Sequence, residues 1–270
     1  MSSVSATPWL RTPRSGVGAE PARARLFCFA HAGGDAGVFR DWPDRLPGLV
    51  EVCGVQLPGR GQRVGEAPYT RIEPLVRDLV DAILPFLDRP YIFFGHSMGA
   101  LVAFELAHAL LTRRAPMPTG LLVSGRRAPH LPPRDRDETP MHALSDAALV
   151  RALRRLRGTP DAVLQHQQYL EFLLPVVRAD LAVCDTNQSR HQQLLACPIR
   201  AYAGEADSVV STEELAEWQR DTAGSFEMTL FPGGHFFLYE ESPDAFLSTL
   251  SDHLMQLVGS GCSLNAFTAS

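Results

Sequence analysis

One pentapeptide of the sequence has the residue types and the spacing of a catalytic serine turn. Gly95-His96-Ser97-Met98-Gly99 fits the pattern G-x-S-x-G. The pattern alone arises by chance in roughly one chain in ten at ordinary Gly and Ser frequencies, so its surroundings decide its meaning. A strand-like apolar run, 91–94, precedes it directly, and a helical pattern, ALVAFELAHALL, follows it directly. This strand–turn–helix context is typical of a nucleophile elbow and predicts Ser97 as a nucleophile.

A serine hydroxyl needs a base to remove its proton, and in triads built on this elbow the acid and then the histidine follow the serine in the chain. His235 lies in Phe-Pro-Gly-Gly-His-Phe-Phe, directly after the last apolar run, 226–231. The two glycines permit a tight loop that can turn the imidazole over a sheet edge. His253 is a competitor, but it lies in the last helical pattern, where we expect a surface residue. His235 is therefore the predicted base.

The acid should follow the preceding strand, and two carboxylates do so. Glu205 and Asp207 both come after the apolar run 199–203. Asp207 lies several residues past the run, where it can reach the second imidazole nitrogen and fix the tautomer. Asp207 is the predicted acid, with Glu205 and the more distant Asp185 as rivals, and a solvated loop carboxylate as the alternative without function.

Two backbone amides are expected to form an oxyanion hole. One belongs to Met98, the residue after the nucleophile. The other belongs to Ala32, in the turn His31-Ala32-Gly33-Gly34 after the run 25–30. His31 and His96 adjoin these turns, and we interpret them as supporting hydrogen-bond partners rather than as metal ligands or bases. No H-x-x-x-H pattern and no grouping of His with carboxylates at ligand spacing occurs, so we expect no metal and no cofactor.

A second turn, Leu57-Pro58-Gly59-Arg60-Gly61, follows the apolar run 50–56. Proline and two glycines make it rigid, so we expect a structural role. Arg60 or Arg63 could instead meet an acidic ligand or partner at the site entrance.

The elements that must carry these turns alternate along the chain. Short, nearly continuous apolar runs indicate parallel strands covered on both faces, and they alternate with patterns of helical period. The expected strands are 25–30, 50–56, 91–94, 120–124, 199–203 and 226–231, and the expected helices are 72–87, 100–111, 212–220 and 243–257. This alternation predicts a mostly parallel central sheet with helices on both faces. Together with the nucleophile elbow at Ser97, it predicts the α/β-hydrolase fold.

One segment departs from the alternation. Residues 126–189 contain helical patterns, at 144–156 and 169–177, but no convincing strand. We expect a helical lid at the carboxyl edge of the sheet, inserted into a single domain over 23–258. Residues 1–22 and 259–270 are rich in small and polar residues, and we expect both ends to be disordered.

Composition excludes several classes of function. The net charge is −5, which argues against nucleic acid as a partner. No apolar run is long enough to cross a bilayer, and residues 1–20 have no signal-like apolar core, so we expect a cytoplasmic monomer that binds no membrane. All 25 basic residues are arginine, which excludes lysine chemistry. Five cysteines without CxxC spacing predict reduced thiols.

Several motifs together resemble a known family. FCFAHAGG, QLPGRGQR, GHSMGALVAFELA, SGRRAPH and the late GEAD and GGH, spread over about residues 24–257, are similar to the stand-alone type II thioesterases of polyketide and nonribosomal peptide synthetases. SGRRAPH, at residues 124–130, is specific because the general fold does not need it. The resemblance places nucleophile, acid and base at Ser97, Asp207 and His235, and the oxyanion hole at Ala32 and Met98.

The resemblance implies hydrolysis of acyl thioesters on the phosphopantetheine arm of an acyl or peptidyl carrier protein, which clears stalled or mis-primed units. Two arginine groups, 126, 127, 134 and 136 and then 151, 154, 155 and 157, are candidate docking sites for an acidic carrier, although a solvated helix face explains the second group equally well. The alternatives are a small-molecule esterase or lipase, a product-releasing fatty acyl thioesterase, and a non-catalytic subunit that binds an acyl chain.

Overall fold

The computed structural model describes residues 7–11, 21–132, 139–188 and 191–264. Seven strands form one sheet in the order β1-β3-β2-β4-β5-β6-β7. Their bounds are β1 Leu10–Arg11, β2 Ala24–Phe29, β3 Val50–Val55, β4 Tyr91–His96, β5 Gly120–Ser124, β6 Ile199–Gly204 and β7 Phe226–Phe231. Only β1 pairs antiparallel with its neighbour among these strands. The predicted, mostly parallel sheet is confirmed.

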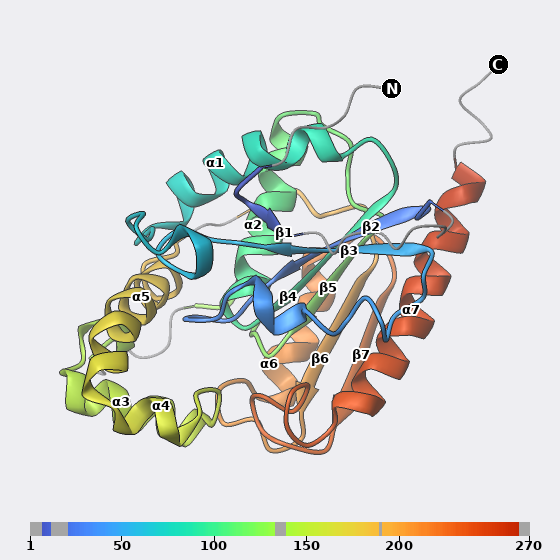
Figure 1. Cartoon of the computed structure of the whole chain (residues 1–270). Helices are drawn as coiled ribbons and strands as arrows, with labels where there is room; N and C mark the ends of the chain where they lie inside the picture. Colours follow the sequence, from blue (N-terminus) through green and yellow to red (C-terminus); the bar gives the residue numbers. More distant parts are fainter. Residues whose placement is uncertain (1–6, 12–20, 133–138, 189–190, 265–270) are drawn as a thin grey trace.

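Alternating side chains of the strands face two separate helical layers. Phe27 and Phe93 lie in the core cluster with α1 (Ile72–Ile83), α2 (Met98–Thr112) and α6 (Thr212–Ala216). Leu26 and Phe94 lie in the cluster with α7 (Pro243–Leu264). Because successive strand residues point to opposite faces, both faces must be apolar. The layers on either side of the sheet are visible in Figure 1.

Between β5 and β6 the chain forms α3 (Asp146–Leu156), α4 (Asp161–Gln165) and α5 (Gln167–Asp185). We call residues 141–185 the helical insertion. It has a small core of its own, which includes Leu149, Leu164 and Val177. Figure 1 shows it beside the sheet, at the end where β2 and β4 run into the turns that follow Phe29 and His96. These three helices lie within the segment 126–189.

The two chain ends differ from the prediction of disorder at 1–22 and 259–270. Leu10 and Arg11 form a strand against Val55 and Gly54, and Leu10 is buried. At the other end, α7 continues to Leu264. The prediction is wrong for these residues because it relied on composition, whereas an available sheet edge and the last turns of a long helix provide the missing hydrogen bonds. The remaining residues of the two predicted tails lie outside the described part, apart from 7–9 and 21–22.

Candidate active site

Ser97 lies in a backbone conformation that few non-glycine residues adopt. It connects β4 directly to α2 with φ 55° and ψ −114°. The turn needs the glycines on either side of it, because a Cβ on Gly95 would lie 2.2 Å from the Gly99 carbonyl oxygen, and one on Gly99 would lie 2.0 Å from the Phe29 carbonyl oxygen. The strained turn therefore holds the serine side chain at the carboxyl edge of the sheet, at the first turn of a helix.

Two loops at the same edge bring a carboxylate and an imidazole to this serine. Asp207 follows β6 and His235 follows β7. His235 Nε2 lies 3.1 Å from Ser97 Oγ, and His235 Nδ1 lies 2.9 Å from Asp207 Oδ2. The imidazole and carboxylate side chains are 3% and 0% exposed. The three side chains form one continuous hydrogen-bonded chain, in which the imidazole and the carboxylate are shielded from water and Ser97 is half-buried.

Backbone contacts between the two loops set this geometry. The amide of Ala206 donates to the Gly233 carbonyl at 2.9 Å. Gly204 must be glycine because a Cβ there would lie 2.2 Å from the Gly234 carbonyl oxygen. Asp207 Oδ1 accepts from the amide of Val209 at 2.7 Å, which leaves Oδ2 for the histidine. The carboxylate is thus oriented before any substrate binds.

The rival residues lie elsewhere. Glu205 is exposed, and the carboxylate of Asp185 contacts His142 Nδ1 at 2.7 Å. His253 is only 5% exposed, and its ring lies 2.7 Å from the Tyr202 hydroxyl. The prediction that His253 is a surface residue is therefore wrong. His253 lies on the face of α7 that packs on the sheet, where its ring forms a hydrogen bond with the Tyr202 hydroxyl.

The two amides of the predicted oxyanion hole lie in the turns that follow β2 and β4. Met98 is the first residue of α2, so its amide has no intrahelical acceptor. Ala32 is within the turn closed by the Gly34 amide, which donates to the His31 carbonyl at 3.0 Å. Gly33, the next residue, has φ +80°, which favours glycine.

A charged pair from outside the predicted set also reaches this loop. Arg60 is buried and pairs with Asp180 of α5, at 2.5 Å and 2.7 Å between nitrogens and oxygens. Asp180 Oδ2 also accepts from the amide of Gly33 at 2.7 Å. The expected structural role of Arg60 thus includes a bond to the insertion. Asp180 was missed, although a carboxylate on the same apolar helix face as Val177 is a recognisable signal.

His31 and His96 are buried beside the site. His96 Nδ1 lies 3.0 Å from Ser124 Oγ, and its ring centre is 5.0 Å from that of His235. Burial lowers the pKa of His31 to about 4, and burial also lowers the pKa of His96 well below its usual value. Both rings are therefore neutral at pH 7 and add no positive charge beside His235.

The SGRRAPH segment anchors the carboxyl end of β5. The carbonyl of Arg126 accepts from Trp218 Nε1 at 2.7 Å, and Arg127 pairs with Glu214 at 3.1 Å. These contacts tie the first arginine group to the core, and its other members, Arg134 and Arg136, lie outside the described residues.

The second arginine group lies on the outside of the insertion. Arg151 and Arg155 on α3 are exposed, and neither has an ion pair with another described residue, whereas Arg154 pairs with Asp161 at 3.1 Å. A groove of about 640 Å³ lies between α3 and α5, and its lining includes Arg151 and Arg154 as well as the carboxylate of Glu171. Arg151 and Arg155 therefore give this part of the insertion an exposed positive charge.

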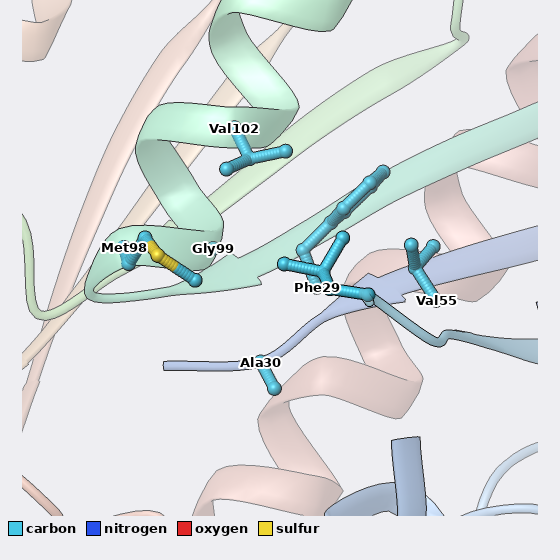
Figure 2. Close-up of a pocket in the computed structure, with 7 residues that line it drawn as sticks. Phe29, Ala30, Val55, Met98, Gly99 and Val102 are labelled. Carbon is cyan, nitrogen blue, oxygen red and sulfur yellow. The ribbon is translucent and has the colours of Figure 1, made fainter. Parts of the chain in front are cut away.

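A small apolar cavity adjoins the serine turn (Figure 2). Its volume is about 10 Å³, and Met98, Gly99 and Val102 of α2 line it together with Phe29 and Val55. The cavity has room for about one water molecule. The cavity lies on the apolar side of the Ser97 turn, next to Met98, whose amide is one of the two predicted oxyanion-hole donors.

Two further features of the described residues bear on the chemistry. In these ranges no group of three or more His, Cys, Asp or Glu side chains is placed to hold a metal ion. Nor does any helix described here have the length and apolar character needed to span a membrane.

Comparison with known proteins gives a consistent result. A family model, the thioesterase domain, matches residues 24–254. Thioesterase PikA5 of Streptomyces venezuelae is 40% identical over 232 residues, which cover 86% of this chain and 81% of that protein.

Two solved structures are similar over almost their whole length. The RedJ thioesterase from the prodiginine pathway of Streptomyces coelicolor is 42% identical with a TM-score of 0.80, and the match covers 89% of this chain and 91% of that one. The type II thioesterase BorB from the borrelidin biosynthetic cluster is 35% identical with a TM-score of 0.80, covering 93% and 100%.

Proposed function

The chain belongs to the thioesterase domain family, and from that premise we propose that it is a type II thioesterase that hydrolyses acyl thioesters on carrier proteins by way of an acyl-enzyme. Thioester hydrolysis and the relation to synthetase-associated thioesterases follow from the family and its members. The residues, the carrier-bound substrate and the editing role are the proposal.

The observation that carries the mechanism is the hydrogen-bonded chain Ser97–His235–Asp207. His235 takes the proton of Ser97 as Oγ attacks the thioester carbonyl, and Asp207 stabilises the imidazolium that results. Collapse of the tetrahedral intermediate breaks the C–S bond, and the thiolate leaves with the proton from His235. Water, deprotonated by the same histidine, then attacks the acyl-serine and releases the acid.

The amides of Ala32 and Met98 would stabilise the oxyanion in both steps. Met98 begins a helix, so the partial positive charge of the helix N-terminus adds to its amide. An oxyanion-hole donor of this type is worth on the order of 10²–10³ in kcat.

The substrate would be short acyl groups on the phosphopantetheine arm of an acyl or peptidyl carrier protein. RedJ is a thioesterase of the prodiginine biosynthetic pathway and BorB is a type II thioesterase of the borrelidin biosynthetic cluster, and both support this assignment. We place the docking of an acidic carrier on α3, where Arg151 and Arg155 lie one helical turn apart on one face.

The test is hydrolysis of a panel of acyl groups, each presented on a carrier protein and on a small thiol. The proposal expects carrier-bound thioesters to react much faster and a broad range of short acyl groups to be accepted. Equal rates with the carrier protein and with the small thiol, or a preference for oxygen esters, would support a small-molecule esterase instead. A sharp preference for one long acyl group would support product release.

A non-catalytic acyl-binding subunit is the candidate from another class. It is disfavoured because binding alone does not require a buried carboxylate aligned on an imidazole that contacts a strained serine. A reactive Ser97, labelled by a fluorophosphonate, would exclude it.

A further inference from the structure

A buried ion pair joins the helical insertion to the loop that carries Ala32. Asp180 lies in α5, and both of its carboxylate oxygens accept from the guanidinium of Arg60. The two side chains are 3% and 6% exposed. A pair of this kind is a weak source of stability, since the loss of hydration offsets most of the attraction. Its placement therefore needs another reason.

The loop supplies that reason. Asp180 Oδ2 accepts from the Gly33 amide at 2.7 Å, and Arg60 Nη1 donates to the Gly34 carbonyl at 3.3 Å. The insertion also presses on the loop directly, because a Cβ on Gly33 would lie 2.7 Å from Val177 Cγ2. The two residues after Ala32 are thus held from α5 and from the Arg60 turn.

We propose that Asp180 is a positioning residue for the oxyanion hole. By accepting the Gly33 amide it fixes the Ala32–Gly33 peptide, and this sets the direction of the neighbouring Ala32 amide. The inference rests on the proposed role of Ala32 in acyl transfer. A bare carboxylate near a developing oxyanion would repel it, and the two bonds from Arg60 neutralise that charge.

The consequence is that α5 of the helical insertion takes part in shaping the oxyanion hole. If α5 moves away, Gly33 loses its acceptor and the oxyanion hole loses its shape. Hydrolysis is then restricted to the state in which α5 lies against the loop.

The obvious variant, Asp180→Leu, leaves Arg60 buried without a partner and is expected to fold poorly. Two double variants avoid this problem because both lack the charged pair. Arg60→Met/Asp180→Asn keeps one acceptor oxygen for the Gly33 amide, and Arg60→Met/Asp180→Leu has none. The pair therefore differs mainly in that single acceptor.

We expect kcat for a short-chain p-nitrophenyl ester to be about 10- to 100-fold lower in the Leu double variant than in the Asn double variant, with KM within threefold. Affinity for a trifluoromethyl ketone, whose adduct carries the oxyanion, should fall by a similar factor. Affinity for an unreactive amide analogue should not change. Asp146→Asn, which removes an ion pair to Arg178 elsewhere on the insertion, serves as a control with unchanged kcat.

Equal kcat values in the two folded double variants would overturn the proposal, as would a change confined to KM. The ester readout keeps this result separate from the proposed function. If the wild-type enzyme hydrolyses the ester but not carrier-bound thioesters, the type II assignment fails, while the comparison of the two variants still decides the role of Asp180.

Discussion

Ser97 combines an unusual backbone with the proposed nucleophile. Its amide donates to the Ser124 carbonyl at 2.7 Å, which holds the φ 55° turn between β4 and α2. Ser97→Ala removes only the hydroxyl, so we expect the fold and melting temperature to be unchanged. The value of kcat for thioester hydrolysis should fall on the order of 10⁶-fold. Hydrolysis within tenfold of wild type would require another nucleophile.

Asp207 is expected to act through the orientation of His235. Asp207→Asn keeps an acceptor for Val209 but favours the wrong histidine tautomer, and kcat should fall on the order of 10³–10⁴-fold. Glu205→Gln is the matched control in the same loop, and it should leave kcat unchanged because Glu205 is exposed. Near-normal activity of Asp207→Asn would return the acid role to Glu205 or Asp185.

The residues that the sequence singles out are those that follow strands within glycine-rich turns. Ser97, Asp207 and His235 could be selected because local patterns surround them, and the structure brings them together. Asp180 has no such turn around it. Its place on an apolar helix face could have marked it as buried, but its partners Arg60 and Gly33 lie 120 and 147 residues away in the chain and could not be identified from the sequence. The error at His253 has the same origin, because the fold decides which face of a helix is buried.

Among the elements, the strands of the core and the helices α2 and α3 were predicted to within two residues at their ends, but α7 extends seven residues beyond its predicted end at 257. The strands of this sheet are apolar on both faces, so each appears in the sequence as a short continuous apolar run that is easy to recognise. The helices α4 and α5 of the insertion were harder to predict from the sequence. The helix α5 extends over Gln167–Asp185 and continues through Pro175, and the short α4 was not expected. Their stability comes from packing within the insertion rather than from a strong local pattern.

The apolar cavity makes a prediction about α2 and the strands that face it. Val102 lines the cavity beside Met98 (Figure 2). Val102→Ala removes two methyl groups from the wall, so the preferred acyl chain should become longer by about one or two carbons, at a stability loss of about 1–3 kcal/mol. The measurement is kcat/KM across saturated acyl thioesters of increasing length. An unchanged profile would place the acyl group elsewhere.

At the scale of the whole molecule, buried histidines link stability to pH. His108 is 4% exposed and stacks on His191 with ring centres 3.6 Å apart. Burial, and then the neighbouring His191, lowers the pKa of His108 to about 3. The unfolded chain takes up this proton near pH 6.5, so stability is lost as the pH falls from about 6.5 toward 3.

His108 alone should therefore account for about 2 kcal/mol of the stability lost between pH 7 and pH 5. His108→Leu should reduce the loss by that amount in urea unfolding at the two pH values. The exposed His166, changed to Gln, should leave the loss as it is in the wild type. If His108→Leu loses as much stability between pH 7 and pH 5 as the wild type does, His108 is already protonated in the folded protein.

The whole molecule must also bring a carrier protein to Ser97, and its net charge of −5 opposes an acidic partner. A local cationic face can overcome this repulsion at short range, because salt screens charges beyond about 8–10 Å.

Arg151→Glu/Arg155→Glu should lower kcat/KM for carrier-bound acyl groups at least about tenfold and weaken the dependence of kcat/KM on salt concentration. The same acyl groups on a small thiol should react as in the wild type, since α3 then plays no part in delivery. Arg71→Glu/Arg77→Glu, at two exposed arginines beside and on α1, makes the same change in net charge at another position. An equal loss in that variant would assign the effect to net charge, and α3 would no longer be the docking face.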